Sequence, residues 1–190
     1  RALANMILGL ITRLDGGTEA RKQFETADNM TSTLGALGAL LSCEYGVKAS
    51  QQFYETWKHE RLVIDKWFSI QMTHAKPEEA LDVVDRLSAH PDFSIKNPNR
   101  FRSVFGPFAG HAGFHAPDGR GYDTLADWLI KLDKINPQPT ARSCSAFDSW
   151  RIFAPERQTQ MQTAMQRILD QEDLSRDTRE MLTRILGEDG

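Results

Sequence analysis

The chain has 190 residues, of which 40% are hydrophobic and 26% are charged, and its formal net charge is −3 at pH 7. This composition is typical of a globular protein with a sizeable core. No apolar run approaches the roughly 20 residues that cross a bilayer, so we expect no membrane contact. The acidic balance disfavours nucleic acid as a partner, because phosphate binding needs a basic face.

Hydrophobic spacing predicts helices along nearly the whole chain, and no segment alternates as a strand does. The first predicted helix is amphipathic rather than a signal peptide, and its apolar stripe comprises Leu3, Ile7, Leu10, Ile11 and Leu14. Later stripes are Leu34, Leu37 and Leu41, then Leu62, Ile64, Trp67, Phe68 and Ile70, then Leu81, Val84 and Leu87, then Leu125, Trp128, Leu129, Leu132 and Ile135, and finally Met161, Ala164, Met165, Ile168 and Leu169. We expect each stripe to pack against a neighbouring helix.

Prolines at first-turn positions mark where several helices begin, since a proline ring needs no amide donor there. These prolines are Pro77, Pro98, Pro137 and Pro155. The last helix is predicted to begin after Ser175 and to end at Gly187. Roughly ten helices of 10 to 16 residues follow from typical helix and loop lengths. The predicted fold is all-α, with antiparallel helix pairs stacked in a solenoid-like superhelical array that forms a single domain over residues 1–190.

The segment 97–122 departs from this regularity, because it places arginines and histidines among glycines, prolines and phenylalanines. One interpretation is a shaped loop that carries recognition. The alternative is a compact connection between helices whose phenylalanines seal the core. Residues 97–151 hold seven Lys or Arg against five Asp and no Glu, a balance that suits a small anion such as a carboxylate.

Two pairs of residues have part of the pattern of a metal site, but neither completes it. His59 and Glu60 begin an HExxH pattern, but Val63 stands where the second zinc-binding histidine would be. His111 and His115 are four residues apart, yet they flank Gly113 in the glycine-rich segment and no third ligand is evident nearby. We therefore expect no metal and no cofactor in this chain.

The cysteines and the remaining motifs predict no catalytic residue. Cys43 and Cys144 lie a hundred residues apart in apolar or small-residue surroundings, which is typical of reduced core thiols. Reduced thiols suit a cytoplasmic location. Cys144 could be a nucleophile only if Arg142 lowered its pKa, and a structural thiol is the better interpretation.

Several runs in order along the chain resemble the C-terminal helical domain of bacterial-type aminopeptidase N, a family of zinc-dependent exopeptidases of the gluzincin class. The runs are ADNMT at 27–31, LVIDKWF at 62–68, NPNRFRS at 97–103, FAG at 108–110, FHA at 114–116, and DG with GY within 118–122. The NPNRxRS and FHAxDGxGY patterns are the most specific, and the resemblance covers essentially the whole chain. The catalytic zinc domain of that family has no counterpart in this sequence.

The resemblance implies a cap that removes no residue itself but encloses the substrate chamber of a zinc aminopeptidase, beside the catalytic domain of the same polypeptide. Zinc would belong to that domain, and the isolated chain would be inactive on its peptide substrates. A free-standing α-solenoid scaffold for protein partners is the alternative.

The resemblance also assigns substrate contacts to Arg102, in the NPNRxRS run, and to Arg142, in a run NPQPTARS after which the sequence diverges from the family. Both assignments suit the chemistry, because a guanidinium can donate two parallel hydrogen bonds to a carboxylate. The alternative for each arginine is an ion pair with a nearby Asp that clamps the fold.

Overall fold

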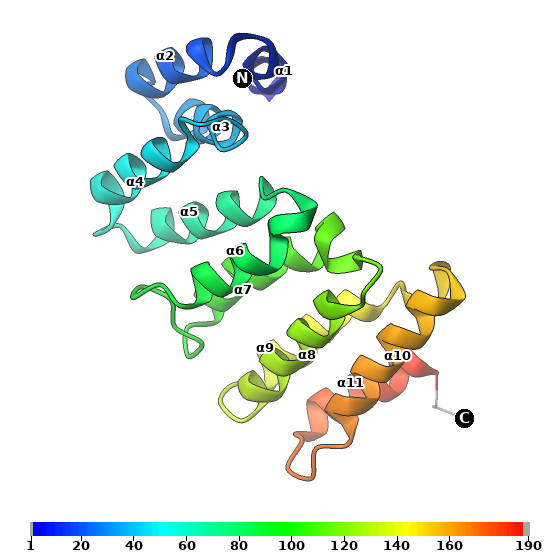
Figure 1. Cartoon of the computed structure of the whole chain (residues 1–190). Coiled ribbons are helices and arrows are strands. Elements are labelled where there is room, and N and C mark those ends of the chain that lie inside the picture. Colours follow the sequence, from blue (N-terminus) through cyan, green and yellow to red (C-terminus); the bar gives the residue numbers. More distant parts are fainter. Residues whose placement is uncertain (1, 188–190) are drawn as a thin grey trace. The chain divides into compact units, whose positions relative to one another are not determined.

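The computed structural model describes residues 2–187, which form eleven α-helices and no strand (Figure 1). The all-α prediction is therefore confirmed. Contacts divide the chain into two compact units, residues 1–75 and residues 76–190, and each is described separately. The helices are 7 to 15 residues long, so the shortest of them fall below the expected length.

The described part of the first unit, residues 2–75, forms five helices. They are α1 (Ala2–Asp15), α2 (Thr18–Thr26), α3 (Met30–Leu40), α4 (Gly46–Trp57) and α5 (Arg61–Thr73). Three of them, α1, α3 and α5, coincide with predicted stripes. Helix α3 is central, because it contacts α1, α2, α4 and α5. Asn29 caps its N-terminus by accepting a hydrogen bond from the amide of Ser32 at 3.0 Å.

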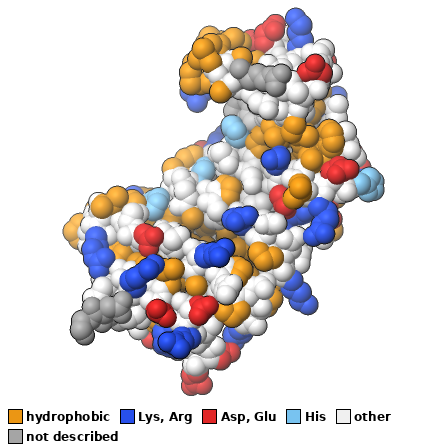
Figure 2. All heavy atoms as spheres, turned by 180° about the vertical axis from the view of Figure 1, so that it is seen from behind, with side chains coloured by type: hydrophobic (Ala, Val, Ile, Leu, Met, Phe, Trp, Pro, Cys, Tyr) orange, Lys and Arg blue, Asp and Glu red, His pale blue; other side chains and the backbone are white. Residues whose placement is uncertain are grey.

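Helix α1 forms as predicted, but the prediction that its apolar stripe is packed is wrong. Leu8 and Thr12 are the buried residues of α1, whereas Leu3, Leu10 and Leu14 are 65%, 57% and 90% exposed. The hydrophobic group over α1 is visible at the upper left of Figure 2. Helices α2 and α3 both contact α1, and Leu8 and Thr12 are buried there while the more hydrophobic stripe stays exposed.

The described part of the second unit, residues 76–187, forms six α-helices and four short 3₁₀ turns. The helices are α6 (Ala80–Ser88), α7 (Pro98–Ala109), α8 (Arg120–Asp133), α9 (Pro137–Ser143), α10 (Pro155–Leu169) and α11 (Arg176–Leu186), and the 3₁₀ turns are η1 (Pro77–Glu79), η2 (Ala112–His115), η3 (Cys144–Phe147) and η4 (Trp150–Ile152). All four predicted prolines stand at the start of an element. Helix α8 packs against α9 and α10, and α9 packs against α11.

About half of the segment predicted as a shaped loop is helical. Asn97 accepts hydrogen bonds from the amides of Asn99 and Arg100, and Pro98 occupies the first turn, so α7 begins there and continues to Ala109. Phe101, Phe105 and Phe108 follow at helical spacing and are buried, as the core-sealing interpretation predicts. The connection over residues 110–119 contains the 3₁₀ turn η2, and Gly119 adopts a left-handed φ of 73° before α8.

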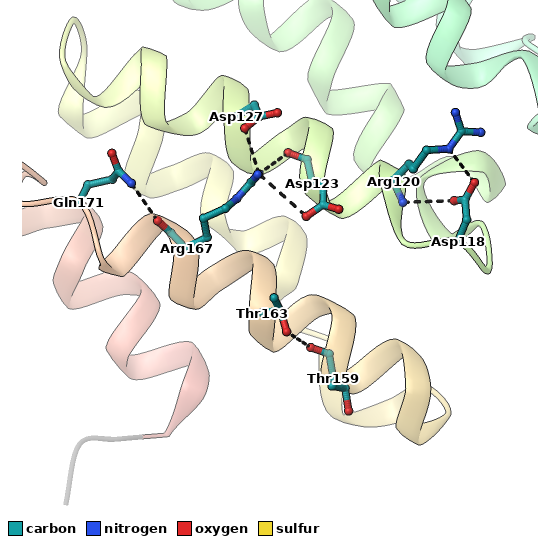
Figure 3. A network of polar contacts seen from close by, with 8 residues as sticks. All are labelled: Asp118, Arg120, Asp123, Asp127, Thr159, Thr163, Arg167 and Gln171. Atoms are coloured by element: carbon teal, nitrogen blue, oxygen red, sulfur yellow. Dashed lines mark hydrogen bonds and ion pairs between the residues drawn. The ribbon is translucent and has the colours of Figure 1, made fainter.

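Two polar clusters hold α8 and its neighbours together. The carboxylate of Asp133 is buried and accepts hydrogen bonds from Ser175 N at 2.7 Å, Ser175 Oγ at 2.6 Å and Thr178 Oγ1 at 2.5 Å, which fixes the start of α11. Near the other end of α8, Arg167 of α10 lies 3.1 Å from Asp127 and donates to the carbonyl of Asp123 at 2.7 Å (Figure 3). These contacts hold α8, one of the helices that line the cavity described next, against α10 and the start of α11.

Candidate functional site

The second unit contains a cavity of about 460 Å³ among α7, α8, α9 and η3. This volume lies within the range of small-molecule pockets, roughly 300 to 1,000 Å³. Its lining comprises Pro98, Phe101, Arg102, Phe105, Gly106, Ala109, Gly110, Leu125, Pro139, Arg142, Ser143, Ser145 and Ala146. The cavity therefore combines apolar side chains with two cationic side chains and two serines.

Both arginines singled out in the sequence line this one cavity, although they lie forty positions apart. Arg102 is in the second turn of α7, and Arg142 is in the last turn of α9. Both residues are exposed to solvent. The fold thus brings together the two side chains that the family resemblance assigned to the same role.

Within residues 2–187, neither guanidinium group is paired with a negatively charged side chain. Nη2 of Arg102 donates to Oδ1 of Asn99 at 2.9 Å, a neutral acceptor one turn earlier in α7. Within residues 2–187, the side chain of Arg142 has no hydrogen-bond or ion-pair partner, and neither arginine forms an ion pair with a carboxylate. No residue of the cavity lining is acidic, so an anion entering the cavity would meet positive charge alone.

Contacts between aromatic rings position the apolar part of the cavity lining. Phe101 and Phe105 stack with their ring centroids 4.4 Å apart, and Phe105 lies 5.0 Å from the ring of Trp128 in α8. Phe101 and Phe105 are almost entirely buried, at 1% and 2% exposure. A site with this arrangement can hold an anionic group against the guanidinium groups and an apolar group against the aromatic floor.

The aromatic side of this site is not predicted from the sequence. Sequence spacing identifies Phe101, Phe105 and Leu125 only as core residues, and they are core residues that also reach the cavity surface. One sequence feature could have indicated this lining: Arg102 and Gly106 directly follow Phe101 and Phe105. The same two turns of α7 therefore carry both the aromatic residues and the residues that open onto the cavity.

His111 and His115 serve the local structure of the segment between α7 and α8. Nδ1 of His111 accepts a hydrogen bond from Gly113 N at 3.1 Å. Nδ1 of His115 lies 3.0 Å from the hydroxyl of Tyr122, and its ring stacks on Phe153 at 4.4 Å. Burial, with a smaller contribution from the charge of Arg157, lowers the pKa of His115.

The described residues contain no group of side chains suited to bind a catalytic metal ion. Among residues 2–187, no group of three or more His, Cys, Asp or Glu side chains could hold a metal ion. His59 is exposed, and Val63 occupies the position of the missing ligand. A zinc site can therefore not be assembled from these side chains alone.

Cys144 has the properties of a structural thiol. It is fully buried, and burial, with smaller contributions from Asp133 and Asp148, raises its pKa to about 12. Cys43 is also a free thiol. Because the thiolate is the nucleophilic form, Cys144 is unsuited to nucleophilic catalysis near neutral pH.

The helices carry no candidate for a membrane span. None of those described in residues 2–187 combines the length and the apolarity that crossing a bilayer requires.

Comparison with known proteins gives consistent matches over nearly the whole chain. The family model described as "Domain of unknown function (DUF3458_C) ARM repeats" matches residues 1–187. The chain is 37% identical to aminopeptidase N of Haemophilus influenzae over 194 aligned residues, which cover 98% of this chain and 22% of that protein. It is 37% identical to aminopeptidase N of Escherichia coli K12, with 87% of this chain and 19% of that protein covered.

A solved structure is similar as well. The crystal structure of Legionella pneumophila aminopeptidase A in complex with aspartic acid superposes with a TM-score of 0.84 at 33% sequence identity. The match covers 90% of this chain and 21% of that one. The chain thus spans about a fifth of the length of the relatives that it matches.

Proposed function

The chain belongs to the DUF3458_C ARM-repeat family, and from this premise we propose that it is the C-terminal cap domain of a zinc aminopeptidase that removes N-terminal residues from peptides. The predicted resemblance to the C-terminal helical domain of aminopeptidase N is confirmed by the same match and by the aminopeptidase N relatives. In this proposal the domain encloses the substrate chamber beside the catalytic domain of the same polypeptide. The length of the relatives supports a multidomain protein of this kind.

The proposal assigns the chemical step to the catalytic domain. Zinc in that domain would polarise the scissile carbonyl and activate water. The side chains of the present chain bind and orient the peptide and take no part in proton transfer. A cytoplasmic location belongs to the same proposal, and the two free thiols support it.

The observation that carries the proposal is the pair Arg102 and Arg142 on one cavity without an acidic side chain in its lining. An aminopeptidase cleaves next to the peptide N-terminus, so the free carboxylate of a short substrate lies on the far side of the scissile bond. Two guanidinium groups without carboxylate partners suit that anion, because each can donate paired hydrogen bonds to it. Arg102 and Arg142 are therefore the proposed substrate-binding residues.

The alternative of a free-standing scaffold has one observation in its favour, the open apolar stripe of α1. The two functions differ in what the gene encodes upstream. An HExxH motif followed by a further glutamate in the same reading frame would exclude the free-standing scaffold. A start codon immediately before Arg1 would instead remove the active site on which the proposal depends.

Kinetics of the full-length enzyme test the role of the two arginines. Arg102→Ala or Arg142→Ala is expected to weaken binding of short free-carboxylate peptides by about 1.5 to 3 kcal/mol, the range for hydrogen bonds to charged groups. Because the contact is remote from the reacting carbonyl, KM rises while kcat changes little. An aminoacyl arylamide, which lacks the carboxylate, is affected less.

Arg120→Ala is the matched control, since Arg120 is an exposed arginine of the same unit that pairs with Asp118 and does not line the cavity. It should leave both kinds of substrate unaffected. Equal losses on peptides and arylamides in the Arg102 and Arg142 variants, or a loss of thermal stability alone, would mean that the arginines are structural.

A further inference from the structure

Gly106 stands inside α7 without a structural reason to be glycine. Its φ is not in the left-handed region, in which the described glycines are Gly16, Gly17, Gly119 and Gly187. A Cβ built on Gly106 would meet only Cγ of Arg102, at an ordinary van der Waals distance of 3.5 Å. Alanine would therefore fit, and it would be the more favourable residue in a helix interior.

Other glycines of the same unit differ in this respect. A Cβ on Gly113 would collide with Cβ of Ala80, and one on Gly121 would collide with the carbonyl oxygen of Phe114. Packing requires glycine at those two positions. It does not require glycine at Gly106, where the missing side chain instead leaves space in the cavity beside Arg102.

The space beside Gly106 is apolar. Phe101 and Phe105 form its aromatic floor, and Ala109 and Leu125 contribute to the same lining. In a peptide, the carboxylate and the side chain of the last residue are both attached to one Cα, so they lie only a few bonds apart. A carboxylate held by Arg102 and Arg142 therefore brings the last side chain to this recess.

We propose that Gly106 keeps open an apolar recess that binds the side chain of the substrate's C-terminal residue. The inference rests on the proposed function and deepens it, because it names the substrate class: short peptides with a free carboxylate and an apolar last residue such as Leu or Phe. Glycine at 106 sets this specificity, while the arginines hold the carboxylate next to it.

The test measures KM of the full-length enzyme for peptides that share an N-terminal residue and end in Gly or in Leu, each as free acid and as C-terminal amide. The unmodified enzyme should have a KM for the Leu-ended acid roughly tenfold below that for the Gly-ended acid, since apolar burial favours it. Gly106→Leu fills the recess and should bring this ratio close to one. Gly106→Ala should give an intermediate ratio and a higher melting temperature.

Gly9→Leu is the matched control, because Gly9 is a helical glycine with open space at its Cβ and lies outside this cavity. It should leave the Leu-to-Gly ratio unchanged. The preference of the Gly106→Leu enzyme for the Gly-ended acid over its amide should persist, which shows that the arginines still engage the carboxylate.

The two proposals fail in different ways. If acids and amides bind alike in the unmodified enzyme, the carboxylate role of Arg102 and Arg142 is wrong. If acids are preferred but Gly106→Leu leaves the Leu-to-Gly ratio intact, or raises KM equally for both peptides, then the recess inference alone is overturned.

Discussion

Replacing Asp133 by Ala should destabilise the start of α11 more than replacing an exposed residue at the same junction. Asp133 is 4% exposed, and its carboxylate accepts three hydrogen bonds, two from Ser175 and one from Thr178. Each hydrogen bond to a charged acceptor contributes about 1.5 to 3 kcal/mol. The three are not additive, because the hydroxyls can turn to other acceptors once the carboxylate is gone. We therefore expect a loss of about 3 to 5 kcal/mol for this cluster.

Hydrogen exchange of the α11 amides, followed by mass spectrometry, measures this loss locally. A loss of about 3 kcal/mol corresponds to a decrease in protection of roughly a hundredfold, if exchange is limited by opening of the helix. Asp173→Ala is the control, because Asp173 lies in the connection that leads to α11 and forms an exposed ion pair with Lys134 at 3.1 Å. An exposed pair contributes about 0 to 1 kcal/mol. Similar effects of Asp133→Ala and Asp173→Ala would refute the reasoning.

Two further predictions concern protonation in the second unit. Because its pKa is raised to about 12, the thiol of Cys144 should be ionised in only about one molecule in 10⁴ at pH 8, and iodoacetamide should label it in unfolded but not in native chain. The same raised pKa means that Cys144 contributes fully to stability below its unfolded pKa of about 9, and that this contribution is lost as the pH rises toward 12. Rapid labelling of the native chain at pH 8 would contradict both statements. The stability contribution of His115 has the opposite pH dependence. Its pKa is lowered, so folding favours the neutral ring, and the contribution is lost as the pH falls below about 6.5. His115→Gln should reduce the loss of melting temperature between pH 7 and pH 5, and an unchanged loss would show that His115 does not contribute.

The sequence predicts the helices well where capping and periodicity agree. Pro155 begins α10, and the stripe that ends at Leu169 is buried, so local propensity and tertiary packing point the same way. The segment after Asn97 is harder to interpret. Gly106 and Pro107 are typical of loops, yet the cap at Asn97 and the spacing of the buried phenylalanines favour a helix strongly enough to include them.

The wrong prediction at α1 and the aromatic cavity lining that was not predicted have a common physical origin. Periodicity identifies the apolar face of a helix, but it does not say which neighbour covers that face, and in α1 the buried residues are Leu8 and Thr12 instead. In the same way, sequence resemblance identifies Arg102 and Arg142 individually. Only the fold of the second unit places them on one cavity, together with the aromatic side chains of Phe101 and Phe105.

The central claim is that Arg102 and Arg142 together bind the free carboxylate of a peptide. A double-mutant cycle tests it most directly, with KM of the full-length enzyme measured for one dipeptide and for its C-terminal amide in the unmodified, single-variant and double-variant forms. We expect that the unmodified enzyme prefers the acid, that each Arg→Ala substitution reduces the preference, and that the double variant binds acid and amide equally. A preference for the acid that survives in the double variant would contradict the claim.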